Sequence, residues 1–167
     1  FPICRQIIEK AAEISKLDLK KSCFEENEKI SITEYTQIAM TAVEAAIFKA
    51  LEEKGFYPDM TAGLSLGEYG ALLVSGAMSL EDIFYTVRKR GIYMQEAVPT
   101  GGAMAAVLGM EAEWIENICK ETQGVVSVAN YNCPGQLVIT GEETAVAKAS
   151  EKLKEAGAKR ILPLQVS

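Results

Sequence analysis

The pattern of apolar positions predicts helices through most of the first hundred residues. Residues 3–17 repeat apolar side chains every three or four positions, which places one buried stripe along an amphipathic helix. Residues 33–54 are alanine-rich and apolar nearly all round in their middle, and Gly55 and Pro58 follow them. We therefore expect this second helix to end there and to be largely buried.

A short strand and two more helices follow in the sequence. Residues 60–63 fit a strand, and residues 67–76 fit a helix that a glycine ends. A longer amphipathic helix is predicted over residues 79–98, where Ser79 and Asp82 have the spacing of a capping box.

The pattern of apolar and polar residues changes after residue 102. Short apolar runs now alternate with amphipathic segments in the order β-α-β-β-α-β, the split pattern of a ferredoxin-like domain. The predicted elements are strands 103–110, 125–132, 136–141 and 160–166 and helices 111–123 and 142–159. This set closes on itself, whereas the first hundred residues offer one strand whose backbone has no partner. We therefore expect the chain to be a piece of a longer polypeptide.

The composition narrows the classes of function. The 167 residues are 49% hydrophobic and 24% charged, as in an ordinary globular protein, and the net charge of −6 gives no basic surface for nucleic acid. No apolar run is long enough to cross a membrane, and the N-terminus lacks the features of a signal peptide. We expect a cytoplasmic protein that binds neither nucleic acid nor membrane. The four cysteines are scattered without a C-x-x-C pair, which argues against a disulfide framework or a zinc site and favours buried thiols. We expect no metal and no cofactor.

The stretch TAGLSLGEY, residues 61–69, places Ser65 between two glycines in the pattern G-x-S-x-G. This pattern is typical of a nucleophile elbow, a tight strand-to-helix turn that needs small residues at Gly63 and Gly67. The turn would point the backbone amide of Leu66 toward the oxyanion that forms when the serine attacks a carbonyl. The alternative is a glycine-flanked helix start without function. The chain contains no histidine to act as the base.

Arg90 is the second candidate for chemistry. It follows Val87 by three residues on the predicted helix 79–98, on the flank of the apolar stripe, where an arginine can hold an anion. The alternative is an arginine whose aliphatic part lies along the core while its guanidinium reaches water. Gly91, inside the stripe, would let another backbone approach closely.

Four further residues are candidates for substrate binding. Met94 also fits ordinary core packing. The other three, Asn130, Asn132 and Gln136, lie in the segment NYNCPGQ, where asparagine and glycine are ordinary turn chemistry.

Four blocks of the sequence, in order, resemble the malonyl-CoA:acyl carrier protein transacylases of fatty acid synthesis and the acyltransferase domains of polyketide synthases. GLSLGEY resembles the family's GHSLGEY, and VRKRGIYMQEAVPTGGAMAAVLG resembles the segment around its substrate arginine. VSVANYNCPGQLVITG and AGAKRILPLQVS resemble two further family blocks. The resemblance covers nearly the whole chain, and four ordered blocks are more specific than one elbow.

The resemblance implies a hydrolase-like α/β core, incomplete in this chain and represented by residues 1–100, with an inserted ferredoxin-like subdomain over residues 101–167. It also implies ping-pong transfer, in which Ser65 takes malonyl from coenzyme A as an ester and passes it to the phosphopantetheine thiol of an acyl carrier protein. Arg90 would then hold the malonyl carboxylate by a bidentate pair. The backbone amide of Leu66 would be half of the oxyanion hole. A leucine at this position also matches the version of the family motif that prefers malonyl.

The sequence departs from the family pattern in three ways. The early GQG-type loop would precede Phe1, and the base histidine would follow the block that ends at LPLQVS. Leu64 stands where the family usually has histidine, so a hydrogen bond behind the elbow is lost. General-base assistance is typically worth about 10² to 10⁴ in rate, so we expect the chain alone to be nearly inert.

Two other functions fit parts of the sequence. A serine esterase or thioesterase on a similar elbow would explain Ser65 but leaves Arg90 and the second half of the chain without a role. A non-catalytic module that binds a carrier protein would explain Leu64 and the missing histidine.

Overall fold

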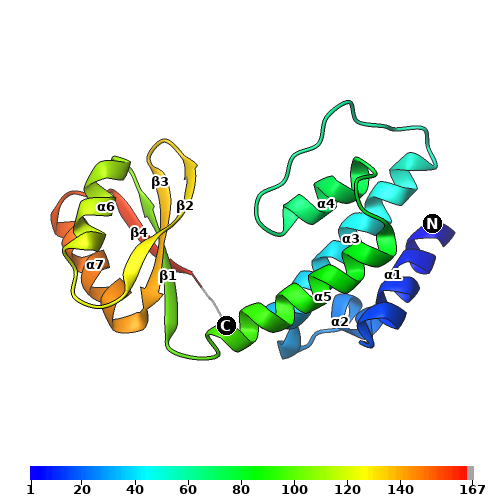
Figure 1. The fold of residues 1–167 in the computed structure, drawn as a ribbon, viewed down its shortest axis with the longest axis horizontal. Coiled ribbons are helices and arrows are strands. Elements are labelled where there is room, and N and C mark those ends of the chain that lie inside the picture. The colour runs from blue at the N-terminus through cyan, green and yellow to red at the C-terminus, as the bar shows by residue number, and fades with distance from the viewer. Residues whose placement is uncertain (165–167) are drawn as a thin grey trace. The chain divides into compact units, whose positions relative to one another are not determined.

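Helix α3, Thr33–Glu52, is the central element of the first of two units into which the chain divides. This unit spans residues 1–97, and the computed structural model as a whole describes residues 1–164. Three more of the predicted helices lie against α3 (Figure 1): α1 (Pro2–Ser15), α4 (Gly67–Val74) and α5 (Leu80–Ala97). The helices predicted for this half of the chain are therefore confirmed.

The apolar period does not predict two short elements between α1 and α3, which are α2 (Leu19–Phe24) and the 3₁₀ helix η1 (Glu28–Ser31). Both are too short to show a period, but each begins at a capping side chain. The Asp18 carboxylate and the Asn27 amide oxygen each accept a hydrogen bond from a backbone amide three residues on, at 3.0 and 3.2 Å. Asp18 and Asn27 are residue types that often begin helices, so their positions in the sequence could have indicated both elements.

Helix α3 is buried on one side only, so the prediction of a largely buried helix is wrong in part. Ala42 and Ala45 are buried in the core of the unit. On the other side three large side chains are about half exposed: Met40, Ile47 and Leu51.

Residues 60–63 are not a strand, in contrast to the prediction. They run as irregular chain toward Ser65. A strand needs hydrogen bonds to a neighbouring strand, and every strand of residues 1–164 lies in the second unit. The apolar pattern of these residues suits a strand, but nothing in the first unit pairs with their backbone.

Ser79 caps helix α5 through the Asp82 amide, one of the two bonds of the predicted capping box, and the helix approaches α3 closely at a glycine. The Ser79 hydroxyl accepts from the Asp82 amide at 3.1 Å and donates to the Asp82 carboxylate at 2.7 Å. Farther along the helix, a methyl group on Gly91 would lie 3.0 Å from Cα and 3.2 Å from the carbonyl oxygen of Glu34 on α3. The close approach of another backbone at Gly91 is therefore confirmed.

We expect Gly91→Ala to lower the free energy of unfolding by about 1–3 kcal/mol, the usual cost of overpacking a tight contact. The added methyl would meet backbone, which cannot rotate aside as a side chain can. Gly70→Ala on α4 is the matched control, because its methyl would meet a carboxylate oxygen of Glu44, the movable end of a side chain, at 3.3 Å. Urea unfolding of both variants checks the prediction, and equal stability of the two would contradict it.

A four-stranded antiparallel sheet and two helices form the second unit, which begins at Val98. The elements follow the predicted order: β1 (Gly102–Leu108), α6 (Ala112–Lys120), β2 (Val126–Cys133), β3 (Gln136–Glu142), α7 (Glu143–Glu155) and β4 (Arg160–Leu164). The strands lie side by side as β2-β3-β1-β4, and each neighbouring pair is antiparallel. The end of the last predicted strand, residues 165–166, lies outside the described residues.

Both helices of the second unit lie on the same face of its sheet (Figure 1). Alternate residues of β1 and β3, such as Val107 and Ile139, are fully buried there against Ile115 of α6 and Leu153 of α7. Within the described part of the chain, no helix is long and apolar enough to span a lipid bilayer.

Candidate active site

Ser65 stands at a tight turn that leads irregular chain into α4. Its φ angle of 54° lies in the left-handed region, which residues with a side chain rarely adopt and which is common at functional sites. Two glycines close the turn, since a methyl group on Gly63 would lie 2.0 Å from the carbonyl oxygen of Gly67. The predicted need for a small residue is therefore confirmed at Gly63, where two stretches of backbone meet. It is not confirmed at Gly67, where an added methyl group would meet no atom within 4 Å.

The backbone amide of Leu66 lies at the N-terminus of α4. Leu66 is the N-cap residue, and the next amides are engaged: that of Gly67 donates to the carbonyl of Leu64 at 2.9 Å. Among residues 1–164 no hydrogen-bond acceptor engages the Leu66 amide itself. An amide at this position can donate to an anion, and the helix dipole favours negative charge there.

Arg90 reaches from α5 to Ser65. Its Nη2 donates to Ser65 Oγ at 2.9 Å, and its Nη1 donates to the side-chain oxygen of Gln37 on α3. The Tyr69 ring of α4 contributes a cation–π contact, with its centroid 5.8 Å from the guanidinium carbon. Three helices therefore hold one guanidinium beside the serine, and the structure brings together the two residues that the sequence analysis singled out for chemistry.

In the described part of the chain, no carboxylate compensates the charge of Arg90. Within residues 1–164 no Asp or Glu oxygen lies within 4.0 Å of its guanidinium, although the side chain is half-buried. Arg88, two residues before Arg90 on the same helix, is instead paired with the Glu34 carboxylate at 3.0 Å. An unpaired and partly desolvated guanidinium is suited to bind an anionic group from outside the chain.

Gln37 is a residue of this site that the sequence analysis missed. It is 6% exposed, and its Nε2 donates to the Met94 sulfur at 3.3 Å while its oxygen faces Arg90. Met94, a predicted substrate-binding residue, thus lies next to the arginine network and is half exposed. The available signal was a polar residue inside an alanine-rich apolar helix, because a buried amide requires hydrogen-bond partners.

Among the described residues, no proton acceptor lies within hydrogen-bond distance of Ser65 Oγ. Within the described residues its hydroxyl has a hydrogen bond to Arg90 alone, and a guanidinium stays protonated in proteins. Leu64, at the family's histidine position, is 70% exposed and has no polar side-chain atom. The arrangement therefore accounts for binding an anion next to the serine but not for activating the hydroxyl.

The other predicted substrate-binding residues lie in the second unit, around the hairpin of β2 and β3. The side chains of Asn130 and Gln136 are half-buried and that of Asn132 is exposed. The Gln136 side-chain oxygen accepts from the Cys133 thiol at 3.5 Å. Substrate binding by these residues stays a prediction.

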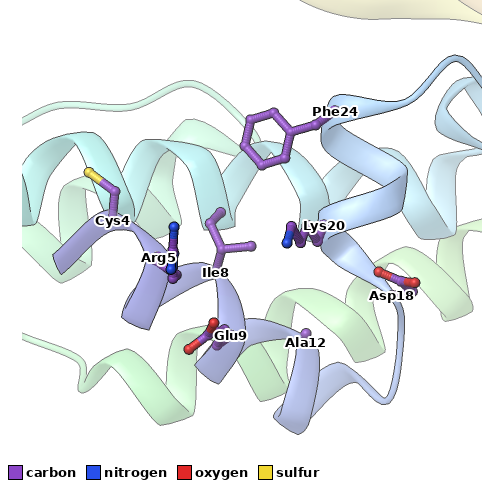
Figure 2. Close-up of a pocket in the computed structure, with 8 residues that line it drawn as sticks. All are labelled: Cys4, Arg5, Ile8, Glu9, Ala12, Asp18, Lys20 and Phe24. Atoms are coloured by element: carbon purple, nitrogen blue, oxygen red, sulfur yellow. The ribbon is translucent and has the colours of Figure 1, made fainter. Parts of the chain in front are cut away.

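Two hollows of the first unit lie near different helices, and Ser65 lines neither of them. One, of about 460 Å³, is lined by residues that include Gly67 and Gly70 of α4 and Thr41 and Glu44 of α3. Burial raises the pKa of the Glu44 carboxyl there. The other, of about 260 Å³ between α1 and α2, contains no predicted site residue (Figure 2). Within residues 1–164 no cluster of three Cys, Asp or Glu side chains could hold a metal ion.

Ser65 thus lies on a tight turn at a helix N-terminus, beside an arginine that no described carboxylate pairs with. The chain belongs to the acyl transferase domain family, whose model matches residues 4–166. The resemblance that four sequence blocks indicated is thereby confirmed.

The chain is similar to malonyl CoA-acyl carrier protein transacylases. That of Bacillus subtilis (strain 168) is 46% identical over 171 residues, covering 99% of this chain and 54% of the relative. That of Staphylococcus aureus (strain MSSA476) is 41% identical over 167 residues, covering 97% and 54%. The chain therefore spans about half the length of these relatives.

Solved structures match the whole chain as well. The transacylase of Streptococcus pneumoniae has a TM-score of 0.91 at 49% identity, covering 100% of this chain and 56% of that one. A malonyl-transacylase in complex with its type II polyketide synthase acyl-carrier protein has a TM-score of 0.94 at 42% identity, covering 100% and 56%. The chain thus shares its mixed α/β fold with a small antiparallel sheet with the matched part of these structures.

Proposed function

We propose that this chain supplies the nucleophile and the carboxylate-binding arginine of an enzyme that transfers malonyl from malonyl-CoA to an acyl carrier protein, in fatty acid biosynthesis. The observation that carries the proposal is the 2.9 Å contact between Arg90 Nη2 and Ser65 Oγ. A malonyl group carries its carboxylate one methylene away from its carbonyl carbon. With that carbon at the serine, the carboxylate lies within reach of the guanidinium, which can bind both of its oxygens.

The proposed reaction is two successive acyl transfers. Ser65 Oγ attacks the thioester carbonyl, coenzyme A leaves as the thiol, and a malonyl ester forms; the phosphopantetheine thiol of the carrier protein then attacks the ester and restores the hydroxyl. The Leu66 amide donates to the oxyanion in both steps. Both attacks need a base, and the 167 residues contain no histidine, so we expect the chain alone to be nearly inert.

The remaining assignments belong to the same proposal. The order of elements and of strands in the second unit supports a ferredoxin-like subdomain over residues 101–167, inserted in a hydrolase-like α/β core to which residues 1–100 belong. Met94 is proposed to bind substrate because of its place beside the Arg90 network. Asn130, Asn132 and Gln136 complete the proposed substrate-binding set, and the chemistry uses no cofactor.

The test is an incubation of the native polypeptide that carries this sequence with malonyl-CoA, followed by an intact-mass spectrum. We expect a malonyl adduct on the protein, which passes to holo acyl carrier protein when that is added. Release of free malonate without any thiol acceptor would instead indicate an esterase or thioesterase. Binding of the carrier protein with no adduct on either partner would indicate a non-catalytic module.

Arg90→Ala is expected to lower kcat/KM for malonyl-CoA relative to acetyl-CoA by about 10- to 100-fold, the worth of a hydrogen bond to a charged group. Acetyl-CoA is the reference because its acyl group has no carboxylate. Arg88→Ala, which removes the neighbouring arginine that pairs with Glu34, is the matched control and should leave this ratio unchanged. Equal losses for both thioesters in Arg90→Ala would assign Arg90 a structural role instead.

A further inference from the structure

Two arginines of α5 reach the same helix, α3, but meet different chemistry there. Nη1 of Arg88 donates both to the Glu34 carboxylate and to the Glu34 carbonyl, each at 3.0 Å. Nη1 of Arg90 donates to the side-chain oxygen of Gln37, less than one helical turn farther along α3. A charged acceptor therefore neutralises the first arginine, and a neutral acceptor holds the second.

Both ends of the Gln37 amide are engaged. Its oxygen accepts from Arg90, and its nitrogen donates to the sulfur of Met94 at 3.3 Å. A thioether sulfur can only accept, so this contact fixes which end of the amide faces the arginine. The side chain is 6% exposed, which leaves little room for another orientation.

We infer that Gln37 is a positioning residue for Arg90: it fixes the guanidinium beside Ser65 without neutralising its charge. The inference rests on the proposed function, in which that charge binds the carboxylate of the acyl group. A glutamate at position 37 would pair with Arg90 as Glu34 pairs with Arg88, and the acyl carboxylate would have to compete with it. An apolar residue there would leave Nη1 without an acceptor, so the guanidinium would be held by Ser65 and Tyr69 alone and would rotate more easily.

The first measurement is the ratio of kcat/KM for malonyl-CoA to that for acetyl-CoA in the native polypeptide. We expect Gln37→Glu to lower this ratio by about 10- to 100-fold, because the ion pair it forms must be broken. Gln37→Met keeps the unbranched shape and should lower the ratio by about tenfold through lost orientation. Glu34→Gln, the matched exchange at the arginine outside the site, should leave the ratio unchanged.

The second measurement does not depend on catalysis: NMR of the Arg90 side chain reports its rotation about the Nε–Cζ bond in the ligand-free protein. Slow rotation in the parent protein that becomes fast in Gln37→Met supports the inference. Unchanged ratios and unchanged rotation in both Gln37 variants overturn it. Should the parent protein not distinguish malonyl-CoA from acetyl-CoA, the carboxylate role of Arg90 fails, and the rotation rates alone decide whether Gln37 positions it.

Discussion

Ser65→Ala is expected to abolish the malonyl adduct of the native polypeptide and to lower transfer to carrier protein by at least about 10⁴-fold, as when a catalytic serine is removed elsewhere. The hydroxyl is the nucleophile that the turn presents, and alanine offers no atom that can form an ester. The fold should persist, because Ser65 is exposed and lies outside the core of its unit. An intact-mass spectrum after brief incubation with malonyl-CoA measures the adduct directly.

The matched control is Ser75→Ala at the other end of α4. The Ser75 hydroxyl is also exposed, and it donates to the Leu72 carbonyl at 3.1 Å. This variant should form the adduct as the parent does. A malonyl adduct that survives in Ser65→Ala would refute the assignment of the nucleophile and leave the family resemblance as the remaining support for the function.

Gly63→Ala is expected to remove the adduct almost as completely, although residue 63 takes no part in the chemistry. Its methyl would lie 2.0 Å from the Gly67 carbonyl oxygen, far inside van der Waals contact, so the turn must open. Ser65 would then lose its place beside Arg90 and at the start of α4. Residues 60–64 are exposed, so thermal unfolding of this variant should stay close to that of the parent.

Gly67→Ala separates this steric effect from a general intolerance of substitution. A methyl group at residue 67 meets no atom within 4 Å, and the residue begins α4 with ordinary helical geometry. The adduct should therefore form in Gly67→Ala at close to the parental rate. Equal adduct formation in Gly63→Ala and Gly67→Ala would show that the turn tolerates opening.

The second unit was predictable from sequence because its interactions are complete within the chain. Each strand of the β-α-β-β-α-β set has a partner among residues 102–164, so period and turn residues suffice to place it. In the first unit the long helices were equally predictable from their apolar stripes. The prediction of a strand over residues 60–63 was wrong because a strand needs a neighbouring strand to pair with. The apolar pattern of one segment does not show whether such a strand is present.

Only those site residues that have a local sequence pattern could be predicted. The glycines around Ser65 indicate a turn, and Arg90 is a charged residue on the flank of an apolar stripe. Gln37 has no comparable local pattern. Its role depends on the packing of α3 against α5, which brings residues 37, 90 and 94 into one hydrogen-bonded set. Glutamine in a buried helix position was the one local sign that such a set existed.

The left-handed backbone at residue 65 limits which nucleophiles evolution can place there. Threonine carries the same hydroxyl, but its branched Cβ makes a φ of 54° strongly unfavourable. Cysteine is unbranched like serine and fits the same turn. The geometry of the backbone, more than the reactivity of the hydroxyl, therefore permits substitution of serine by cysteine at this position and disfavours threonine.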